Sequence, residues 1–176
     1  MTLALHRAHL DTPLGGMMAL ATDEALCALE FHKGERLTRF AQRLARWFSP
    51  FAIHDGTNAA IDAARDWLAA YFAGEGDEPD VPLDMRGAPF ECRVWQELRR
   101  IPRGTTTSYG AIARRLGDVG ASRAVGTANG ANPVAIIVPC HRVIGANGAL
   151  VGYGGGLDRK TWLLDHERRW RTDSLF

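Results

Sequence analysis

The chain has 176 residues, of which 46% are hydrophobic and 23% charged, the composition of an ordinary globular protein with one large or two small domains. Its 21 basic and 20 acidic residues leave a formal net charge of +1, which excludes a strong overall attraction to nucleic acid or to an anionic membrane. No apolar run approaches the length of a membrane span, and the three cysteines form no CxxC pair, so we expect a soluble protein in a reducing cytoplasm.

The first third of the chain predicts strands followed by helices. The segments LALHRAHLDT, GMMALAT and ALCALEF are short and apolar, and turn-forming residues separate them, which favours an antiparallel meander. The segments ERLTRFAQRLARWF and TNAAIDAARDWLAAYF then place apolar and aromatic residues at helical spacing. Such stripes are far more often core than ligand site, so we interpret both as core.

The segment AGEGDEPDVPLDMRGAP breaks every periodicity with glycine, proline and acidic residues. It predicts a linker at about residues 74–86. We therefore expect an N-terminal domain over residues 1–84 and a C-terminal domain over residues 85–176.

The remaining segments predict a mostly helical domain. PFECRVWQELRRI reads as a helix with Pro89 in its first turn, and SYGAIARRLG as a helix capped by Ser108. The tight turn GDVG leads to a short helix of small residues around Arg123, a weak helix-turn-helix signal. VAIIV predicts a buried strand ended by Pro139, and RKTWLLDHERR predicts a final helix.

Positive charge gathers in the middle of the chain. Eight arginines lie between residues 86 and 123, against three acidic residues. This local field could hold a polyanion although the chain as a whole is nearly neutral. Solvated helix faces would give the same pattern, and charge alone leaves both interpretations open.

The segment AIIVPCHRVIG places Cys140 directly before His141 and Arg142. Neighbouring cations stabilise a thiolate, which is the nucleophilic form of cysteine. In extended chain, however, consecutive side chains point in opposite directions, so we expect one of the two cations to face away from the thiol. A zinc site would need a second pair of ligands, a cysteine protease a distant histidine, and a redox site a resolving cysteine; none fits. Cys27 and Cys92 are interpreted as structural.

Four segments together resemble a known family. IPRGTTTSYGAIA, SRAVGTANGANPVAIIVPCHRVIG, GYGGG and KTWLLDHE are similar, in order and spacing, to the C-terminal half of the O6-alkylguanine-DNA alkyltransferases, and DTPLGG to their N-terminal domain. The resemblance implies an α+β fold of two small domains. The first would be an antiparallel sheet with helices (RNase H-like), and the second a mostly helical domain of winged helix-turn-helix type that carries the active site.

The resemblance also implies a chemistry, in which an alkylated guanine is flipped out of the duplex and its alkyl group passes irreversibly to a cysteine. Cys140 would be the nucleophile and acceptor. His141 would take the thiol proton through a water molecule, and Glu167 would orient His141. Asn132 would brace the turn beneath the active-site segment, and Tyr109 would donate a proton to the departing guanine and crowd the rotating phosphate.

Contacts with the substrate follow from the same resemblance. Arg123 would fill the gap left by the flipped nucleotide, with Ala121 and Ser122 near phosphates in the minor groove. The base pocket would be formed by Tyr153, Val143, Gly154 and Gly155. The three glycines at 154–156 suggest a roomier pocket than in some bacterial relatives, open to adducts larger than methyl.

We expect no cofactor and no metal, because the zinc-binding Cys/His set of animal relatives is not evident in this sequence. The expected partner is double-stranded DNA, bound through the minor groove by a monomer, and the sequence leaves cooperative binding open. Two alternatives remain. A non-catalytic damage sensor would lack the acceptor cysteine, and a helix-turn-helix regulator would need longer side chains on its recognition helix.

Overall fold

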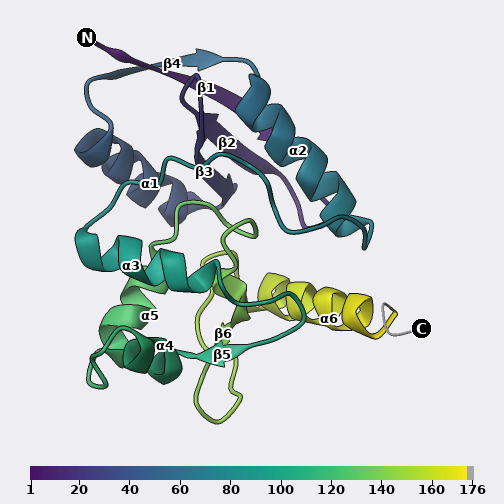
Figure 1. Ribbon diagram of the computed structural model, residues 1–176. Coiled ribbons are helices and arrows are strands. Elements are labelled where there is room, and N and C mark those ends of the chain that lie inside the picture. The colour runs from purple at the N-terminus through teal and green to yellow at the C-terminus, as the bar shows by residue number, and fades with distance from the viewer. Residues whose placement is uncertain (174–176) are drawn as a thin grey trace. The chain divides into compact units, whose positions relative to one another are not determined.

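The computed structural model describes residues 1–173, with side chains described to residue 170. The chain divides into two compact units, one formed by Met1–Gly87 with Pro133–Ala135 and the other by Ala88–Asn132 with the chain from Ile136 onward. The first unit contains a four-stranded sheet and the second is mostly helical (Figure 1), which confirms the predicted α+β fold class. No helix within the described residues is long and apolar enough to cross a membrane.

The sheet of the first unit begins with the predicted meander. β1 (Leu3–Leu10), β2 (Met17–Ala21) and β3 (Leu26–Phe31) pair antiparallel in sequence order. A further strand, β4 (Phe51–Asp55), pairs parallel with β1 and forms the other edge of the sheet. Sequence patterns missed β4, because four of its five residues are exposed and an edge strand of that kind carries little hydrophobic alternation.

Two amphipathic helices lie on opposite sides of this sheet (Figure 1). α1 (Gly34–Trp47) buries Phe40 and Leu44 in a cluster that also contains Leu5 of β1 and Leu20 of β2. α2 (Ala59–Phe72) buries its own apolar stripe, and the side chain of its N-cap residue Asn58 accepts a hydrogen bond from the helix backbone. The interpretation of both stripes as core is confirmed.

The second unit consists of short helices around a small parallel strand pair. Its elements are α3 (Pro89–Leu98), β5 (Thr107–Ser108), α4 (Tyr109–Arg115), α5 (Ser122–Gly130), the 3₁₀ turn η1 (Cys140–Arg142), β6 (Val143–Ile144) and α6 (Leu157–Asp173). β5 pairs with β6, which brings the start of α4 next to the chain that follows η1. This pairing joins the two segments that carry Tyr109 and Cys140.

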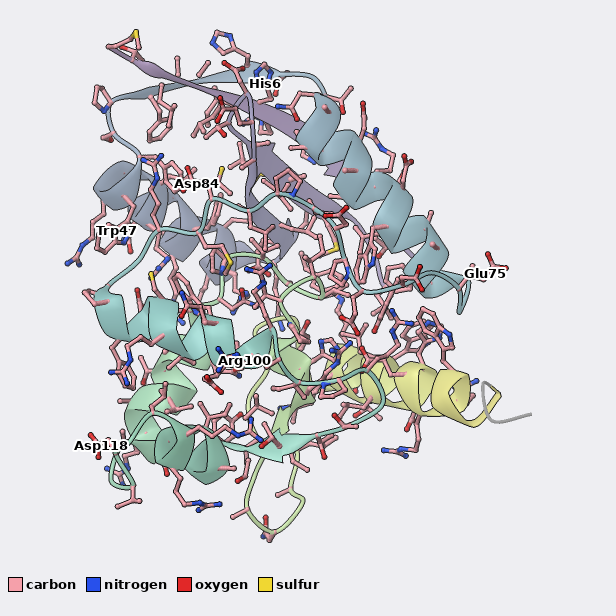
Figure 2. All side chains as sticks on the ribbon, in the orientation of Figure 1. His6, Trp47, Glu75, Asp84, Arg100 and Asp118 are labelled. Carbon is pink, nitrogen blue, oxygen red and sulfur yellow. The ribbon has the colours of Figure 1, made fainter. Side chains whose placement is uncertain are left out.

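α5 packs against its two preceding helices. The buried indole of Trp95 on α3 donates to the carbonyl of Ala128 on α5, over 2.9 Å. α4 and α5 are joined by a tight turn in which Gly117 has a φ of +81°, a value that favours glycine. Asp118 lies in the same turn (Figure 2), and its side chain accepts a hydrogen bond from the backbone N–H of Gly120.

The predicted strand over VAIIV is wrong. Residues 134–138 are buried, but Val134 makes only an isolated bridge to Leu29, and the chain then turns. Ile136 has a φ of +68°, which is a strained conformation for a β-branched residue and lies outside the β region. The apolar run is buried as a turn rather than a strand, a distinction that hydrophobicity alone does not make.

Candidate active site

The candidate nucleophile Cys140 lies at the first residue of η1. Its side chain is buried, with 6% of the residue exposed, and its backbone N–H bonds the carbonyl of Val138 over 2.8 Å. The buried side chain of Asn132 also donates to that Val138 carbonyl, over 2.8 Å, so it holds the turn that leads into the thiol. Asn129 of α5 donates to the Cys140 carbonyl over 3.3 Å. Side-chain hydrogen bonds thus hold the backbone on both sides of the sulfur.

The two residues that follow the thiol share one carboxylate. Nε2 of His141 lies 2.7 Å from Oε1 of Glu167. The guanidinium of Arg142 donates to both oxygens of Glu167, each over 2.9 Å, and to the carbonyl of Ile101 over 2.6 Å. His141 and Arg142 thus point to the same carboxylate, because residues 140–142 form a 3₁₀ turn instead of extended chain. That one of them faces away from the thiol stays a prediction.

This cluster is almost completely buried, which decides its charges. His141 and Glu167 are 0% exposed, and Arg142 is 4% exposed. Burial alone would raise the pKa of Glu167, but its bonds to His141 and Arg142 hold that pKa well below its ordinary value. Burial lowers the pKa of His141, against the opposing pull of Glu167, so the ring is neutral at pH 7.

The tautomer of His141 follows from these contacts. A carboxylate only accepts hydrogen bonds, so Nε2 carries the proton and donates it to Glu167. In a neutral ring the other nitrogen, Nδ1, is then an acceptor. Nδ1 is buried and has no hydrogen-bond partner among the described residues. It is a free base within one residue of the thiol.

Tyr109, the first residue of α4, borders this region. Its hydroxyl donates to the carbonyl of Val151 over 3.1 Å, and a Cβ placed on Gly126 of α5 would lie 3.7 Å from its ring. Burial raises the pKa of Tyr109, and the charge of Cys140 raises it further. Tyr109 is therefore a protonated phenol within electrostatic reach of the thiol.

The segment expected to wall the pocket is only partly buried. Val143 and Gly155 are buried, whereas Tyr153 and Gly154 are half-buried. The side chain of Arg159 on α6 donates to the Gly155 carbonyl over 2.9 Å.

The residues expected at the DNA surface lie around the start of α5. Ala121 is its N-cap residue and makes no side-chain cap, Ser122 is half-buried, and Arg123 is exposed. Ser108 caps α4 as expected, because its hydroxyl accepts from the N–H of Ala111 over 3.0 Å.

Sequence reasoning missed two residues. Arg142 received no role, although its place beside His141 was a signal. Lys160 of α6 was overlooked; it is fully buried, and its ammonium group donates to three backbone carbonyls. Among residues 1–170, no three histidine, cysteine or acidic side chains are grouped in a way that could hold a metal ion.

Family models match both parts of the chain. The model "6-O-methylguanine DNA methyltransferase, ribonuclease-like domain" matches residues 5–85, and "6-O-methylguanine DNA methyltransferase, DNA binding domain" matches residues 89–169.

Relatives that are similar over almost the whole chain agree with these family matches. The chain is 46% identical over 165 residues to a methylated-DNA–protein-cysteine methyltransferase of Mycobacterium bovis, covering 93% of each chain. It is 42% identical over 173 residues to one of Salmonella typhimurium, covering 94% of this chain and 96% of the relative. Among solved structures it is similar to Mycobacterium tuberculosis OGT in complex with DNA, with a TM-score of 0.78 and 43% identity over 96% of this chain and 94% of that one.

Proposed function

The chain belongs to the methylated-DNA–protein-cysteine methyltransferases, DNA-repair enzymes that act on DNA, and we propose that it flips O6-alkylguanine out of duplex DNA and transfers the alkyl group irreversibly to Cys140. The observation that carries this proposal is the buried His141–Glu167–Arg142 cluster directly after Cys140. It supplies a free imidazole nitrogen next to a thiol. Each molecule would act once, because the S–C bond of the thioether that forms is stable to water and the thiol is not regenerated.

The cluster activates the thiol in our proposal. Nδ1 of His141 accepts the Cys140 proton through a bridging water molecule, and Glu167 stabilises the imidazolium that forms. Arg142 keeps Glu167 ionised and fixes the plane of its carboxylate.

The transfer step is a single displacement. The Cys140 thiolate attacks the alkyl carbon, an S–C bond forms as the C–O6 bond breaks, and the electron pair stays on the guanine. The raised pKa of Tyr109 keeps its hydroxyl protonated, so it can give a proton to the leaving guanine. To do so, the hydroxyl must exchange its bond to Val151 for one to the base. The proton held on His141 then returns to Tyr109 through solvent, which balances the reaction.

DNA binding is assigned to α5 as the recognition helix of a helix-turn-helix. Its small residues would allow close approach in the minor groove, where readout is largely blind to sequence. Arg123, exposed in its first turn, would fill the space of the flipped nucleotide, and Ala121 and Ser122 would lie near phosphates. Tyr153, Val143, Gly154 and Gly155 would surround the base.

The test is a transfer experiment with labelled DNA. The protein is incubated with an excess of a duplex that carries a labelled O6-methyl group, and peptide mass spectrometry locates the label. We expect one methyl group per protein on the peptide that contains Cys140, and no transfer by C140S with DNA binding largely retained. Tight binding by an unmodified wild-type protein would instead identify a damage sensor, and equal binding of undamaged and damaged DNA a regulator.

A second measurement concerns the size of the adduct. The glycines at 154–156 predict that O6-benzylguanine in a duplex is repaired at a rate comparable to O6-methylguanine. Single-turnover rates on two otherwise identical duplexes compare them directly. Inertness toward the benzyl adduct, with normal methyl transfer, would contradict the prediction.

A further inference from the structure

The chain between α3 and β5 contacts the buried cluster at two backbone points. The carbonyl of Ile101 accepts a hydrogen bond from the Arg142 guanidinium over 2.6 Å. The backbone N–H of Gly104 donates to Oε2 of Glu167 over 3.5 Å. Residues 101–105, which we call the cover turn, are thus attached both to the carboxylate and to the cation that keeps it ionised.

The cover turn is tight and lies at the surface. The N–H and the hydroxyl of Thr105 both donate to the carbonyl of Pro102, over 3.2 Å and 2.7 Å. Gly104 has a φ of +76°, the value of the third residue of a type II turn, which favours glycine. Pro102 is exposed, whereas Glu167 is 0% exposed, so the turn separates the carboxylate from solvent. Arg103 is the second residue of this turn, and its position therefore sets the direction of the Gly104 N–H.

The guanidinium of Arg103 is stacked on Trp170 of α6. Its Cζ lies 3.5 Å from the centre of the indole ring, and the side chain is half-buried. Trp170 ends a row of rings on α6, because its ring lies 6.0 Å from that of His166, which in turn lies 4.8 Å from that of Trp162. A cation over an indole face is attracted to the ring, more strongly where water is partly excluded. The row of rings thus gives Arg103 a fixed platform.

The contact between the cover turn and Glu167 is sensitive to the position of the turn. A distance of 3.5 Å is at the upper limit for a hydrogen bond, so a small outward movement of Gly104 breaks it. The same movement would admit water to the carboxylate. Both changes would reach His141, because Nε2 of its ring lies 2.7 Å from the other oxygen of Glu167.

We propose that Arg103 and Trp170 are positioning residues that hold the cover turn closed over Glu167 and keep water away from the His141–Glu167 pair. The proposal rests on the role of His141 as the base in the proposed function. Arg103 and Trp170 act through the position of the Gly104 N–H and through the exclusion of water, without a contact to the substrate.

An open cover turn would change the titration of His141 in a defined direction. Burial lowers the pKa of His141, and the charge of Glu167 opposes that shift. Water around the pair would relieve the effect of burial, and Glu167 with one donor fewer would attract a proton on the ring more strongly, so the pKa of His141 would rise. A protonated His141 cannot accept the thiol proton, and alkyl transfer would therefore slow at acidic pH.

The elements that pack around His141 carry further charges that the variants below leave in place. These charged groups are Glu167 and Lys160 of α6, Arg142 of η1, and the Glu97–Arg100 pair at the end of α3. A change in the titration of His141 in these variants therefore reports on the cover turn.

The first experiment titrates His141 without DNA. Protein labelled with ¹³Cε1-histidine gives an NMR signal for each of its six histidines, and H141Q identifies the signal of His141. We expect the pKa of His141 to rise in R103M, which keeps a long apolar side chain and loses the charge, and in W170L. W170F retains an aromatic face and should restore the wild-type titration.

W162L is the matched control, because Trp162 lies at the other end of the row of rings. This variant should leave the titration of His141 unchanged. The proposal is overturned by a wild-type titration in both R103M and W170L. It is equally overturned by a shift in W162L or W170F as large as that in W170L.

The second experiment measures single-turnover transfer from an O6-methylguanine duplex between pH 5 and 8. We expect the acid limb of the rate profile to move to higher pH in R103M, with rates on that limb about threefold lower, the effect of half a unit in the pKa of His141. Above pH 7.5 the variant should match the wild type. A rate that is reduced equally at every pH would contradict the proposal. Wild-type protein that takes no methyl group at any pH would refute the proposed function instead, and the NMR titration would still test the cover turn.

The third measurement uses the wild-type protein alone. The ring current of Trp170 should move the side-chain NMR signals of Arg103 upfield of those of exposed arginines. Arg103 signals at ordinary arginine positions would show that the guanidinium does not lie on the indole ring, and the proposal would be wrong.

Discussion

At the residue scale, the candidate site depends on one buried carboxylate with two partners. Glu167 receives a bond from His141 and two from Arg142, and all three side chains are buried. Removing one partner of a buried ion pair is strongly destabilising, because the other charge is left without compensation. Arg142 is therefore a structural requirement of the site as well as the group that keeps Glu167 ionised.

We predict that R142K lowers the free energy of unfolding by about 2 kcal/mol at pH 7, since lysine keeps the charge but not the two-pronged bond. The pKa of Glu167 is lower in the folded than in the unfolded protein, so its contribution is complete above the ordinary carboxyl pKa and is lost as the pH falls below it. The difference between variant and wild type should thus shrink below about pH 4. Urea denaturation of both proteins at pH 7 and at pH 3.5 measures this difference in the free energy of unfolding.

R168K is the matched control for this prediction. Arg168 pairs with Asp165 on the same helix, but the Arg168 side chain is exposed and that of Asp165 is only half-buried. Exposed pairs contribute little, so this variant should differ from the wild type by less than about 0.5 kcal/mol at either pH. A loss in R142K that is no larger than in R168K would show that the buried bonds do not stabilise the fold.

At the element scale, α4 depends on its cap, because it spans only Tyr109–Arg115 and a helix of that length has little stability of its own. We predict that S108A lowers the free energy of unfolding by about 1 kcal/mol, because the N–H of Ala111 loses its acceptor. T106A, at an exposed position two residues earlier, should change it by less than about 0.5 kcal/mol. Chemical denaturation of both variants and the wild type measures these differences. A free energy of unfolding for S108A equal to that of the wild type would exclude a stabilising role for the cap.

The elements also show where local sequence patterns are sufficient to predict secondary structure. The helices with clear apolar periodicity, such as α1 and α2, form where they were predicted, because their own side chains define the face that is buried. β4 and residues 134–138 do not follow this rule. β4 exists because β1 offers a pairing partner, and the 134–138 run turns at Ile136 instead of extending.

At the scale of the whole molecule, the path of the chain departs from a simple series of domains. Residues 133–135 return to the first unit, where the backbone groups of Leu29 bond to Pro133 and Ala135. Five residues later the chain reaches Cys140 in the second unit. The composition predicts a linker before α3, but nothing in it predicts this return, because the return is fixed by backbone bonds to a strand about 100 residues away.

The sequence by itself determined the family and the candidate nucleophile, because Cys140, His141 and the segments around them carry their chemistry in consecutive residues. Only the tertiary structure decided how that chemistry is assembled. Glu167 meets Arg142 across 25 positions, and Lys160 meets Val143 across 17. Bonds of this kind depend on where α6 packs against η1, and that packing is set by burial throughout the unit, which no local pattern of residues encodes.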